Sequence, residues 1–365
     1  MLQQMLAEQR VSEVREAVIR AVAIVLAYID DPDKYFLGYE LLLVSLADSA
    51  EGVQVTGRSS LLPSLACWAA ELDRLEPHLL AGLLCKLQAL CSEWTAVQDE
   101  RKLCMYLSVV HSLLPCLFVH VLQTAPFVEQ AASVIGNVKL EEARFSEASS
   151  TLGDARVLAG GPERLAALVF LYEESIAAEH TWASLHWIEK EMLPGLVVVA
   201  QAVGATADPC VHDLCSLLHC LCSTFGYTFT EKMVKPAFKP FLKLLEGPSA
   251  CGEYMVGSAC LPLYASGVLA SHIQDRQELA GFLEQLLDGI STAQLPLDVL
   301  KVTFTCLSSD EQLHQLLLQA LWAAVVHPAP NVRCATAKVF EVILRLMDVS
   351  LVDQAYCPSP CHTGQ

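Results

Sequence analysis

The sequence predicts an all-α fold, an α-solenoid made of HEAT- or armadillo-like helical pairs. Apolar residues recur at helical spacing along almost the whole 365-residue chain. Alternating strand patterns between glycine turns are absent, which disfavours β and α/β folds. In addition, a short polar turn followed by a helix with a valine near its start recurs, with about 40 residues between the first two copies. Together these three observations predict stacked helical repeats.

The composition helps to decide between a membrane protein and a stack of buried helices. Hydrophobic residues make up 53% of the chain and charged residues only 18%, which is more apolar than helices with one exposed polar face require. Residues 103–128 contain no charged side chain and are long enough to cross a bilayer. However, they include Pro115 and Pro126 and directly follow three charged residues, and the second apolar stretch, 192–207, is short. We therefore expect no integral membrane span, because helices covered on several sides by neighbouring repeats explain the composition.

Charge and cysteine content narrow the possible functions. Acidic residues outnumber basic residues 41 to 23, giving a formal net charge of −18, whereas binding to nucleic acid needs clustered lysine and arginine. The 15 cysteines are scattered along the sequence, and residues 1–10 lack the basic start and apolar core of a secretory signal. We expect a cytoplasmic protein with reduced, mostly buried thiols and no nucleic-acid partner.

The N-terminal helices can be placed in order along the chain. Ser12 is expected to cap a first helix, which ends at Asp30-Asp31-Pro32. The broad apolar face of this helix is predicted to contain Val14, Ala17, Val18, Ala21, Val22 and Val25. Further helices are predicted over residues 35–46, 51–72, 77–91 and 99–123. A kink is predicted at Pro63.

Three turns define the predicted repeat. In a HEAT-like unit the turn residue caps the second helix, the valine packs inward, and an arginine reaches back to polar turn groups of a neighbouring repeat. The first and third turns share the pattern Val-Arg-x-Ala, whereas Gln54 stands at the arginine position of the second. The structural positions predicted for these turns are Ser12, Val14, Arg15, Ala17, Asp48, Val53, Asn331, Val332, Arg333 and Ala335.

The chain is predicted to contain two blocks of repeats. Residues 1–123 form the first block, and 124–162, which are rich in glycine and serine, form an inserted flexible linker with one helical turn around 140–145. The second block covers 163–351, with a disordered tail over 352–365. Neither end carries a polar capping repeat, so we expect the interior of a longer array, or an isoform or fragment of one. Prolines are expected mostly near helix ends: Pro194, Pro209, Pro236, Pro240, Pro248, Pro262 and Pro296.

No motif predicts catalysis. Phosphate loops, dinucleotide fingerprints, Gly-x-Ser-x-Gly elbows and His-Glu-x-x-His helices are absent from the sequence, so no enzyme and no cofactor are predicted. The densest Cys/His cluster places His212, Cys215 and His219 on one helix face, a spacing that zinc can use. Because paired Cys hooks on turns are missing, buried thiols with partly exposed histidines are the preferred interpretation, and no metal is predicted. The other members of this cluster are Cys210, Cys220 and Cys222.

A second candidate feature is a basic stripe. On a helix, four lysines would share one face that meets anionic lipid or an acidic partner; the alternative is an ordinary solvated face. Pro236 and Pro240 argue against a continuous helix there. The four lysines are Lys232, Lys235, Lys239 and Lys243.

Several stretches resemble one known family. The most specific stretch is Tyr28 to Tyr35, and the others are 14–19, 105–108, 211–212, 234–236, 264–269 and 332–334. They resemble, in order from about residue 1 to about residue 353, the HEAT region of the RELCH family. Members of this family are Rab-binding proteins that contain LisH, coiled-coil and HEAT elements. In the family, the LisH and coiled-coil parts lie upstream of the similar region, and a further HEAT unit follows it.

The resemblance implies a non-enzymatic scaffold or tether. Its implied partners are a Rab GTPase of recycling endosomes and oxysterol-binding protein at the trans-Golgi network. Its implied role is to support cholesterol transport from recycling endosomes to that network. Membrane association is then expected only through these partners. The alternative left open by the repeats is a regulatory HEAT scaffold of a phosphatase or kinase complex.

Overall fold

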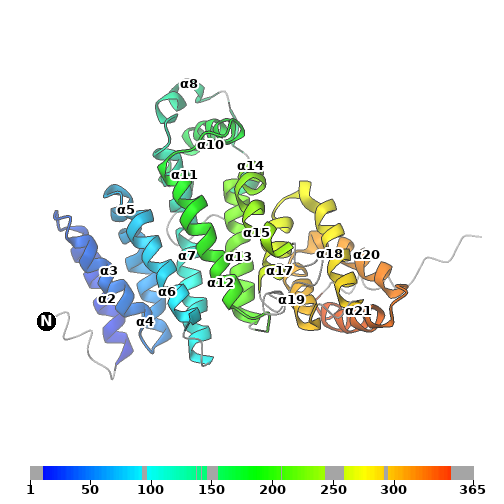
Figure 1. The fold of residues 1–365 in the computed structure, drawn as a ribbon. Helices are drawn as coiled ribbons and strands as arrows, with labels where there is room; N and C mark the ends of the chain where they lie inside the picture. The colour runs from blue at the N-terminus through cyan, green and yellow to red at the C-terminus, as the bar shows by residue number, and fades with distance from the viewer. Residues whose placement is uncertain are drawn as a thin grey trace, which may run out of the picture. The chain divides into compact units, whose positions relative to one another are not determined.

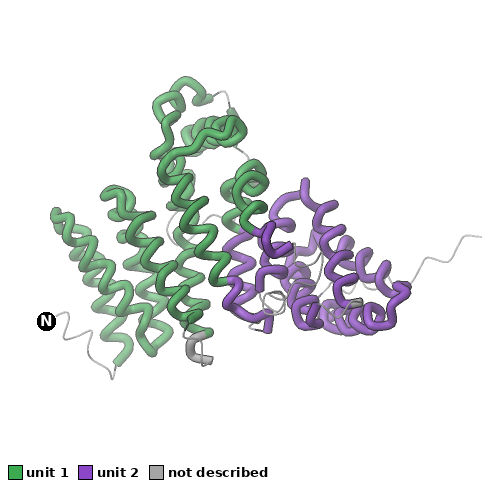
Figure 2. The backbone as a smooth tube through the Cα atoms, in the orientation of Figure 1, with its two compact units in different colours: residues 1–199, 220–237 green, residues 200–219, 238–365 purple. Residues whose placement is uncertain are grey.

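The computed structural model of this protein contains only helices as regular elements within the residues it describes (Figure 1). This confirms the predicted all-α class. The residues described are 11–92, 97–136, 138–140, 142–145, 155–206, 208–242, 259–291 and 295–346. The chain forms two compact units (Figure 2), unit 1 over 1–199 and 220–237, and unit 2 over 200–219 and 238–365.

Unit 1 begins with helices that pack side by side in chain order (Figure 1). Their short connections make neighbouring helices antiparallel, as expected for stacked helical pairs. These helices are α2 (Ser12–Ala27), α3 (Lys34–Leu46), the continuous α4 (Glu51–Thr56), η1 (Gly57–Leu61) and α5 (Leu62–Glu71), then η2 (Leu75–Leu80), α6 (Ala81–Ser92) and α7 (Val97–Gln123). The predicted helix ranges in this region match these bounds closely.

The rest of unit 1 packs around the end of α7. Its elements are η3 (Val128–Gln130), α8 (Ala131–Val134), η4 (Glu142–Phe145), α9 (Ala155–Leu158), α10 (Pro162–Ala177), α11 (Ala183–Trp187), η5 (Ile188–Met192), α14 (Tyr227–Phe229) and η6 (Thr230–Val234). Three helices cross a unit boundary: α12 (Leu193–Ala202), α13 (Asp208–Phe225) and α15 (Lys235–Leu242).

Unit 2 ends in two helical pairs that pack against each other. Its elements after α15 are α17 (Cys260–Pro262), η8 (Leu263–Val268), η9 (Leu269–Ser271), η10 (Ile273–Asp275), α18 (Arg276–Ser291), α19 (Leu297–Leu307), η11 (Glu311–Leu313), α20 (His314–Val325) and α21 (Pro330–Ile343). Helix α21 contacts α18, α19 and α20. This arrangement covers α19 on more than one side, which explains its high apolar content.

Helix α7 is the central helix of unit 1. Residues Glu100–Gln123 are long and apolar enough, by length and composition, to cross a membrane, but 78% of the most apolar window is buried inside the protein. Leu107, Leu114 and Phe118 are among its fully buried residues. Protein side chains therefore cover the surface that lipid would otherwise have to cover.

Pro194 and Pro236 lie inside continuous helices rather than at their ends, which corrects the prediction for them, and Pro63 lies inside the helix predicted over 51–72. Pro63, Pro194 and Pro236 each stand two residues after a π-helical segment, respectively η1, η5 and η6. A proline ring clashes with the carbonyl four residues earlier, and that carbonyl lies within the π-helical segment in all three cases. The wider π turn moves the carbonyl away, so the helix continues through the proline. Of the remaining prolines, Pro209 and Pro296 do lie at helix starts, and Pro248 is outside the described residues.

The buried face of α2 differs from the predicted one. Val18 and Val22 are buried as expected, but Ala17, Ala21 and Val25 are exposed and Val14 is half-buried. The face that packs against α3, α4 and η1 is instead formed by Arg15, Val18, Ile19, Val22, Ala23 and Leu26. Because α2 carries apolar residues well beyond its buried face, its sequence alone did not specify which stripe would face its neighbours.

Part of the predicted linker contributes to the core of unit 1. Phe145 of η4 is fully buried, and its ring packs against Phe118 of α7. Arg144 donates from Nε to the Thr224 carbonyl at 2.9 Å and from Nη1 to Glu173 at 2.7 Å. The helical turn predicted near these residues is η4. The predicted domain boundaries stay a prediction, and the predicted tail lies outside the described residues.

Candidate protein-interaction surfaces

The second predicted turn is held by an ion pair between its Asp48 and Arg15, which follows the first predicted turn. Arg15 donates from Nε to Oδ2 at 2.7 Å and from Nη2 to Oδ1 at 2.8 Å. Both side chains are largely buried, and Asp48 Oδ1 also accepts the Ala50 N–H at 2.8 Å. Burial alone would raise the pKa of Asp48, but the hydrogen bonds from Arg15 and Ala50 outweigh it and lower this pKa. The arginine of one helix therefore fixes the turn that starts the next helical pair.

Gln54 binds the same turn from the other side. Its Nε2 donates to the Asp48 carbonyl at 2.7 Å, and the preceding Val53 is fully buried. Gln54, which stands at the arginine position of the second turn, thus binds the turn at the start of its own helix. Asp48 therefore receives side-chain hydrogen bonds from two helices of unit 1, α2 and α4.

At the third predicted turn, the arginine of the Val-Arg-x-Ala motif makes a different contact. Val332 and Ala335 are buried in α21, whereas Arg333 is exposed and donates from Nη1 to the carbonyls of His327 and Pro328, both at 2.8 Å. Arg333 therefore binds the turn before its own helix and not a neighbouring repeat. In α2 the arrangement is reversed, since Arg15 is buried and Ala17 is exposed. The two Val-Arg-x-Ala sites are not structurally equivalent.

The predicted helix caps also differ from the structure. Ser12 is the first residue of α2 rather than its N-cap, and its hydroxyl donates to Glu13 at 3.3 Å. Asn331 is exposed within α21, whose N-cap is Ala329. Pro330 starts this helix. The N–H of a first helical residue has no intrahelical partner, so the missing N–H of proline costs no hydrogen bond there.

The four lysines do not form one exposed cationic stripe among the described residues. Lys232 donates from Nζ to the carbonyls of Ile176 and Ala177 at 3.2 and 2.9 Å, which closes the C-terminus of α10. Lys235 is buried and paired with Glu231. Lys239 is exposed, and Lys243 lies outside the described residues. The helix is continuous through Pro236 and Pro240, contrary to the prediction.

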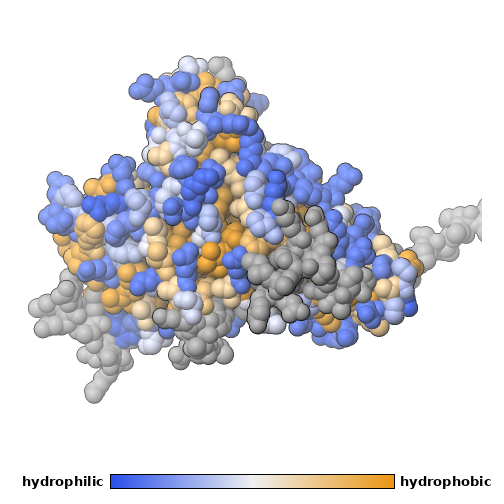
Figure 3. Space-filling model, in the orientation of Figure 1, coloured by the Kyte–Doolittle hydropathy of each residue, from blue (hydrophilic) through white to orange (hydrophobic). Residues whose placement is uncertain are grey.

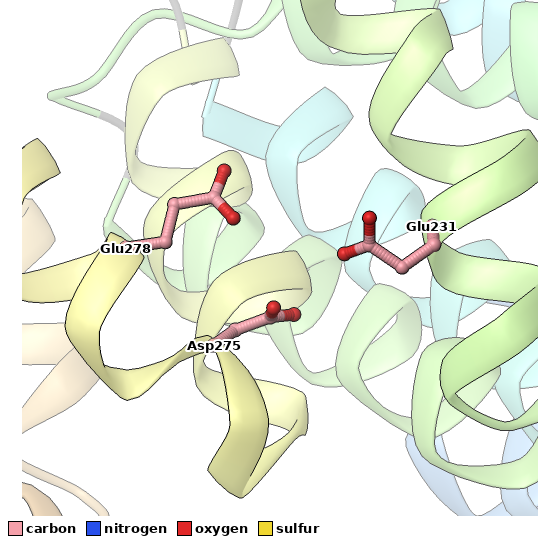
Figure 4. A group of neighbouring side chains, drawn as sticks. All are labelled: Glu231, Asp275 and Glu278. Atoms are coloured by element: carbon pink, nitrogen blue, oxygen red, sulfur yellow. The ribbon is translucent and has the colours of Figure 1, made fainter.

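The predicted Cys/His cluster lies on α13. Cys210, Cys215, Cys220 and Cys222 are buried, whereas His212 is exposed and His219 half-buried. They do not form a metal-ligating group in the part of the chain that the structure describes. Figure 4 draws the acidic side chains Glu231, Asp275 and Glu278. They come from different units, so they are not interpreted as a site. Glu278 accepts a hydrogen bond from Tyr264 within unit 2.

Exposed apolar side chains mark a first surface on unit 1. Ile24 and Tyr28 of the α2 end are 61% and 87% exposed, and Val44 on α3 is 57% exposed. Figure 3 shows apolar surface over this part of the molecule. Clustered exposed apolar residues are typical of protein interfaces. We define the N-terminal surface as Ile24, Val25, Tyr28, Leu37 and Val44.

A groove between α20 and α21 forms a second surface, on unit 2. It has a volume of about 440 Å³ and is lined by Trp322, Val325, Arg333, Ala337, Phe340, Glu341 and Leu344. Trp322 is 40% exposed and its ring lies 5.4 Å from that of Phe340. An aromatic anchor beside Arg and Glu is a composition that protein interfaces favour. We call this the C-terminal groove.

Neither surface was predicted from the sequence. In the sequence, Tyr28 stands out only as part of a family-like stretch, and nothing distinguishes Trp322 from other apolar residues. Both belong to apolar helix stripes that look like core positions in the sequence. No signal of spacing or composition separates an exposed apolar residue from a buried one in helices that are apolar on most sides.

Two family models match segments of this chain. The family model of the RAB11-binding protein RELCH N-terminal domain matches residues 1–126, and that of the RELCH C-terminal domain matches residues 257–361. The chain belongs to the RELCH family. The N-terminal surface falls in the first of these RELCH domains and the C-terminal groove in the second.

Curated relatives match almost the whole chain. The human RAB11-binding protein RELCH is 42% identical over 98% of this chain. The RELCH homologs of Xenopus tropicalis and Danio rerio are 41% and 38% identical over the same share. The chain spans about 30% of the length of the human relative.

Proposed function

We propose that this chain is a non-enzymatic scaffold that binds a RAB11-type Rab GTPase. The observation that carries the proposal is the match to both RELCH domains, in relatives that are named as RAB11-binding proteins. Stacked helical pairs support it, because they present extended rigid surfaces suited to binding a folded partner. A Rab GTPase reorganises its switch segments around the γ-phosphate. We therefore expect binding to depend on the bound nucleotide.

The two exposed apolar surfaces are the candidate contact regions. Trp322 lies on α20 and Tyr28 directly follows α2, and aromatic side chains often dominate the free energy of protein binding. Each lies in a family-matched segment. Truncating the residue that contacts the GTPase is expected to weaken binding by roughly 2 kcal/mol, which is about thirtyfold in Kd.

A binding titration tests the Rab proposal. The chain is titrated against RAB11 loaded with a non-hydrolysable GTP analogue or with GDP, with human RELCH as the positive control. Tyr28→Ala and Trp322→Ala are compared with Val157→Ala, which truncates a residue that is 75% exposed and lies between the two family-matched segments. Loss of affinity in one aromatic variant but not in Val157→Ala supports the proposal. Absence of binding to both nucleotide forms, while human RELCH binds, overturns it for this chain.

We further propose a role in cholesterol transport from recycling endosomes to the trans-Golgi network, through oxysterol-binding protein as second partner. The support for this finer role is the resemblance to the RELCH family. Co-precipitation with oxysterol-binding protein, and recovery of sterol delivery in cells depleted of their own RELCH, test it. A chain that binds RAB11 but neither co-precipitates oxysterol-binding protein nor restores sterol delivery would retain only the Rab-binding role.

A further inference from the structure

Two consecutive side chains hold the turn η4 against the rest of unit 1. Among the described residues, no backbone hydrogen bond joins 138–145 to another part of the unit. The contacts come instead from Arg144, whose side chain is 10% exposed, and from Phe145, which is 1% exposed. A turn of four residues has little other surface to bury. Its position therefore depends on this arginine-phenylalanine dipeptide.

The site that receives Arg144 provides the partners that a guanidinium needs. The Thr224 carbonyl accepts from Nε at 2.9 Å, and a Glu173 carboxylate oxygen accepts from Nη1 at 2.7 Å. The guanidinium carbon also lies 5.7 Å from the centroid of the Phe118 ring, within the range of a cation–π interaction. This set of partners favours arginine, because a planar guanidinium donates in two directions while it lies over an aromatic ring.

Gly226 keeps the arginine position open. Its φ is +90°, a conformation that glycine adopts without strain. A Cβ at this position would lie 2.6 Å from both Nη2 of Arg144 and Oε1 of Glu173. A larger residue would therefore push the guanidinium away from its acceptors.

The site that receives Phe145 is aromatic. The centroid of its ring lies 5.9 Å from that of Phe118 on α7. The Phe118 ring in turn lies 5.5 Å from the ring of Tyr172 on α10 and 4.9 Å from that of Phe225 on α13. All these residues belong to unit 1. Removing the Phe145 ring would leave an apolar cavity of the kind that takes up a free aromatic ring.

We propose that unit 1 contains a recognition site for an arginine-aromatic dipeptide of a partner protein, and that Arg144 and Phe145 occupy it as an internal ligand until the partner displaces them. The fit of the internal ligand is incomplete, because Nη2 of Arg144 is buried without a hydrogen-bond partner among the described residues. An unpaired buried N–H costs free energy. This cost weakens the retention of η4 and favours its exchange for a segment that places its guanidinium better. The site shares no residue with the N-terminal surface or the C-terminal groove, so it is independent of the Rab proposal.

A binding comparison in the full chain tests the proposal. The probe is a fluorescent peptide with the sequence of residues 138–145, and the control peptide carries alanine in place of the arginine and the phenylalanine. In the wild type, the internal ligand competes with the probe at an effective concentration of the order of millimolar. The double variant Arg144→Ala/Phe145→Ala lacks this competitor. We expect it to bind the probe at least about tenfold more tightly than the wild type does, and not to bind the control peptide. A folded double variant that binds the probe no better than the wild type does, or no better than it binds the control peptide, overturns the proposal.

Two further substitutions in the double variant locate the bound probe. Glu173→Gln removes the charge of the carboxylate that accepts from the arginine, and it should weaken probe binding by roughly tenfold. Glu174→Gln is the matched control, because it changes the exposed neighbour on the same helix, and it should leave binding unchanged. Equal effects of the two substitutions would place the peptide elsewhere and overturn the assignment of the site.

Fluorine NMR decides the question if circular dichroism shows that the double variant does not fold. Phe145 is labelled as 4-fluorophenylalanine in the otherwise unsubstituted chain, which keeps its ring in place. Unlabelled probe peptide at millimolar concentration should move the fluorine signal to the position of a solvent-exposed ring, because it displaces η4 from the site. The control peptide should leave the signal unchanged. A signal that does not respond to the probe would show that η4 is a permanent part of the core, which overturns the proposal.

Discussion

Arg15 of α2 holds Asp48 through two parallel hydrogen bonds of 2.7 and 2.8 Å across 33 residues of sequence. Paired N–H donors and carboxylate oxygens give this contact a fixed orientation. Asp48 in turn accepts the N–H of Ala50, which is the N-cap of α4. One contact therefore couples α2 to the start of α4.

Arg15→Ala should destabilise the protein by about 2–3 kcal/mol, because it leaves a largely buried carboxylate without its charged partner. Arg333→Ala is the matched control, since it removes the arginine of the same Val-Arg-x-Ala motif from an exposed position. The control substitution should lower the free energy of unfolding by less than about 1 kcal/mol. Urea unfolding of both variants measures the difference. Equal costs would show that the Arg15 contact has no special role in stability.

The contribution of Asp48 to stability should depend on pH in the acidic range. Its pKa is lowered in the folded state, so the unfolded state binds a proton more readily. The stabilisation is then present above the unfolded pKa of about 3.9 and is lost as pH falls through the lower folded pKa. The difference in unfolding free energy between wild type and Arg15→Ala should shrink below about pH 4. A difference that stays constant from neutral pH to this range would contradict the ion pair as its cause.

Val332→Asp should cost about 3–5 kcal/mol, because Val332 is fully buried in α21 and the new carboxylate would have no paired charge. Cys334→Asp places the same charge two residues further along the same helix, at an exposed position. We expect that control to shift the melting temperature little. Thermal unfolding by circular dichroism compares the two variants, and a normal melting temperature for Val332→Asp would refute the burial of this position.

Gly57→Ala should destabilise unit 1 by about 1–3 kcal/mol through overpacking. A Cβ at Gly57 would lie 2.8 Å from the Cβ of Ser45 on α3. Ser45→Gly in the same protein should recover part of the loss, which a double-mutant cycle measures. Gly281→Ala in α18 is the matched control, since nothing lies within 4 Å of its Cβ position. It should be neutral or stabilising by up to about 1 kcal/mol. Simple additivity of Gly57→Ala and Ser45→Gly would argue against the close approach.

Helical periodicity was sufficient to predict the fold class and most helix bounds in the first block. It was not sufficient to predict how the helices accommodate their prolines. The sequence predicts a kink at Pro63 and helix ends near Pro194 and Pro236, but the helices continue past all three through π-helical turns. Whether a helix breaks or widens at a proline depends on the packing on both sides of it, and that information is not local in sequence.

The side-chain contacts of the Val-Arg-x-Ala motif were also only partly predictable from the sequence. The arginine contact to a neighbouring turn was expected at both Val-Arg-x-Ala sites, yet Arg15 makes it and Arg333 does not. The exposed residues Tyr28 and Trp322, which are the candidate contact residues, were not recognised.

The sequence by itself determined an all-helical protein of the RELCH family, because apolar spacing fixes local helix formation and ordered motifs persist among relatives. The tertiary structure decided which helix face is buried, which arginine is paired and which aromatic residues remain exposed. In helices that are apolar on nearly every side, local free energy scarcely distinguishes one rotation about the axis from another. The choice is made by the neighbouring helices, through close packing and the need to pair buried charges such as Arg15 and Asp48.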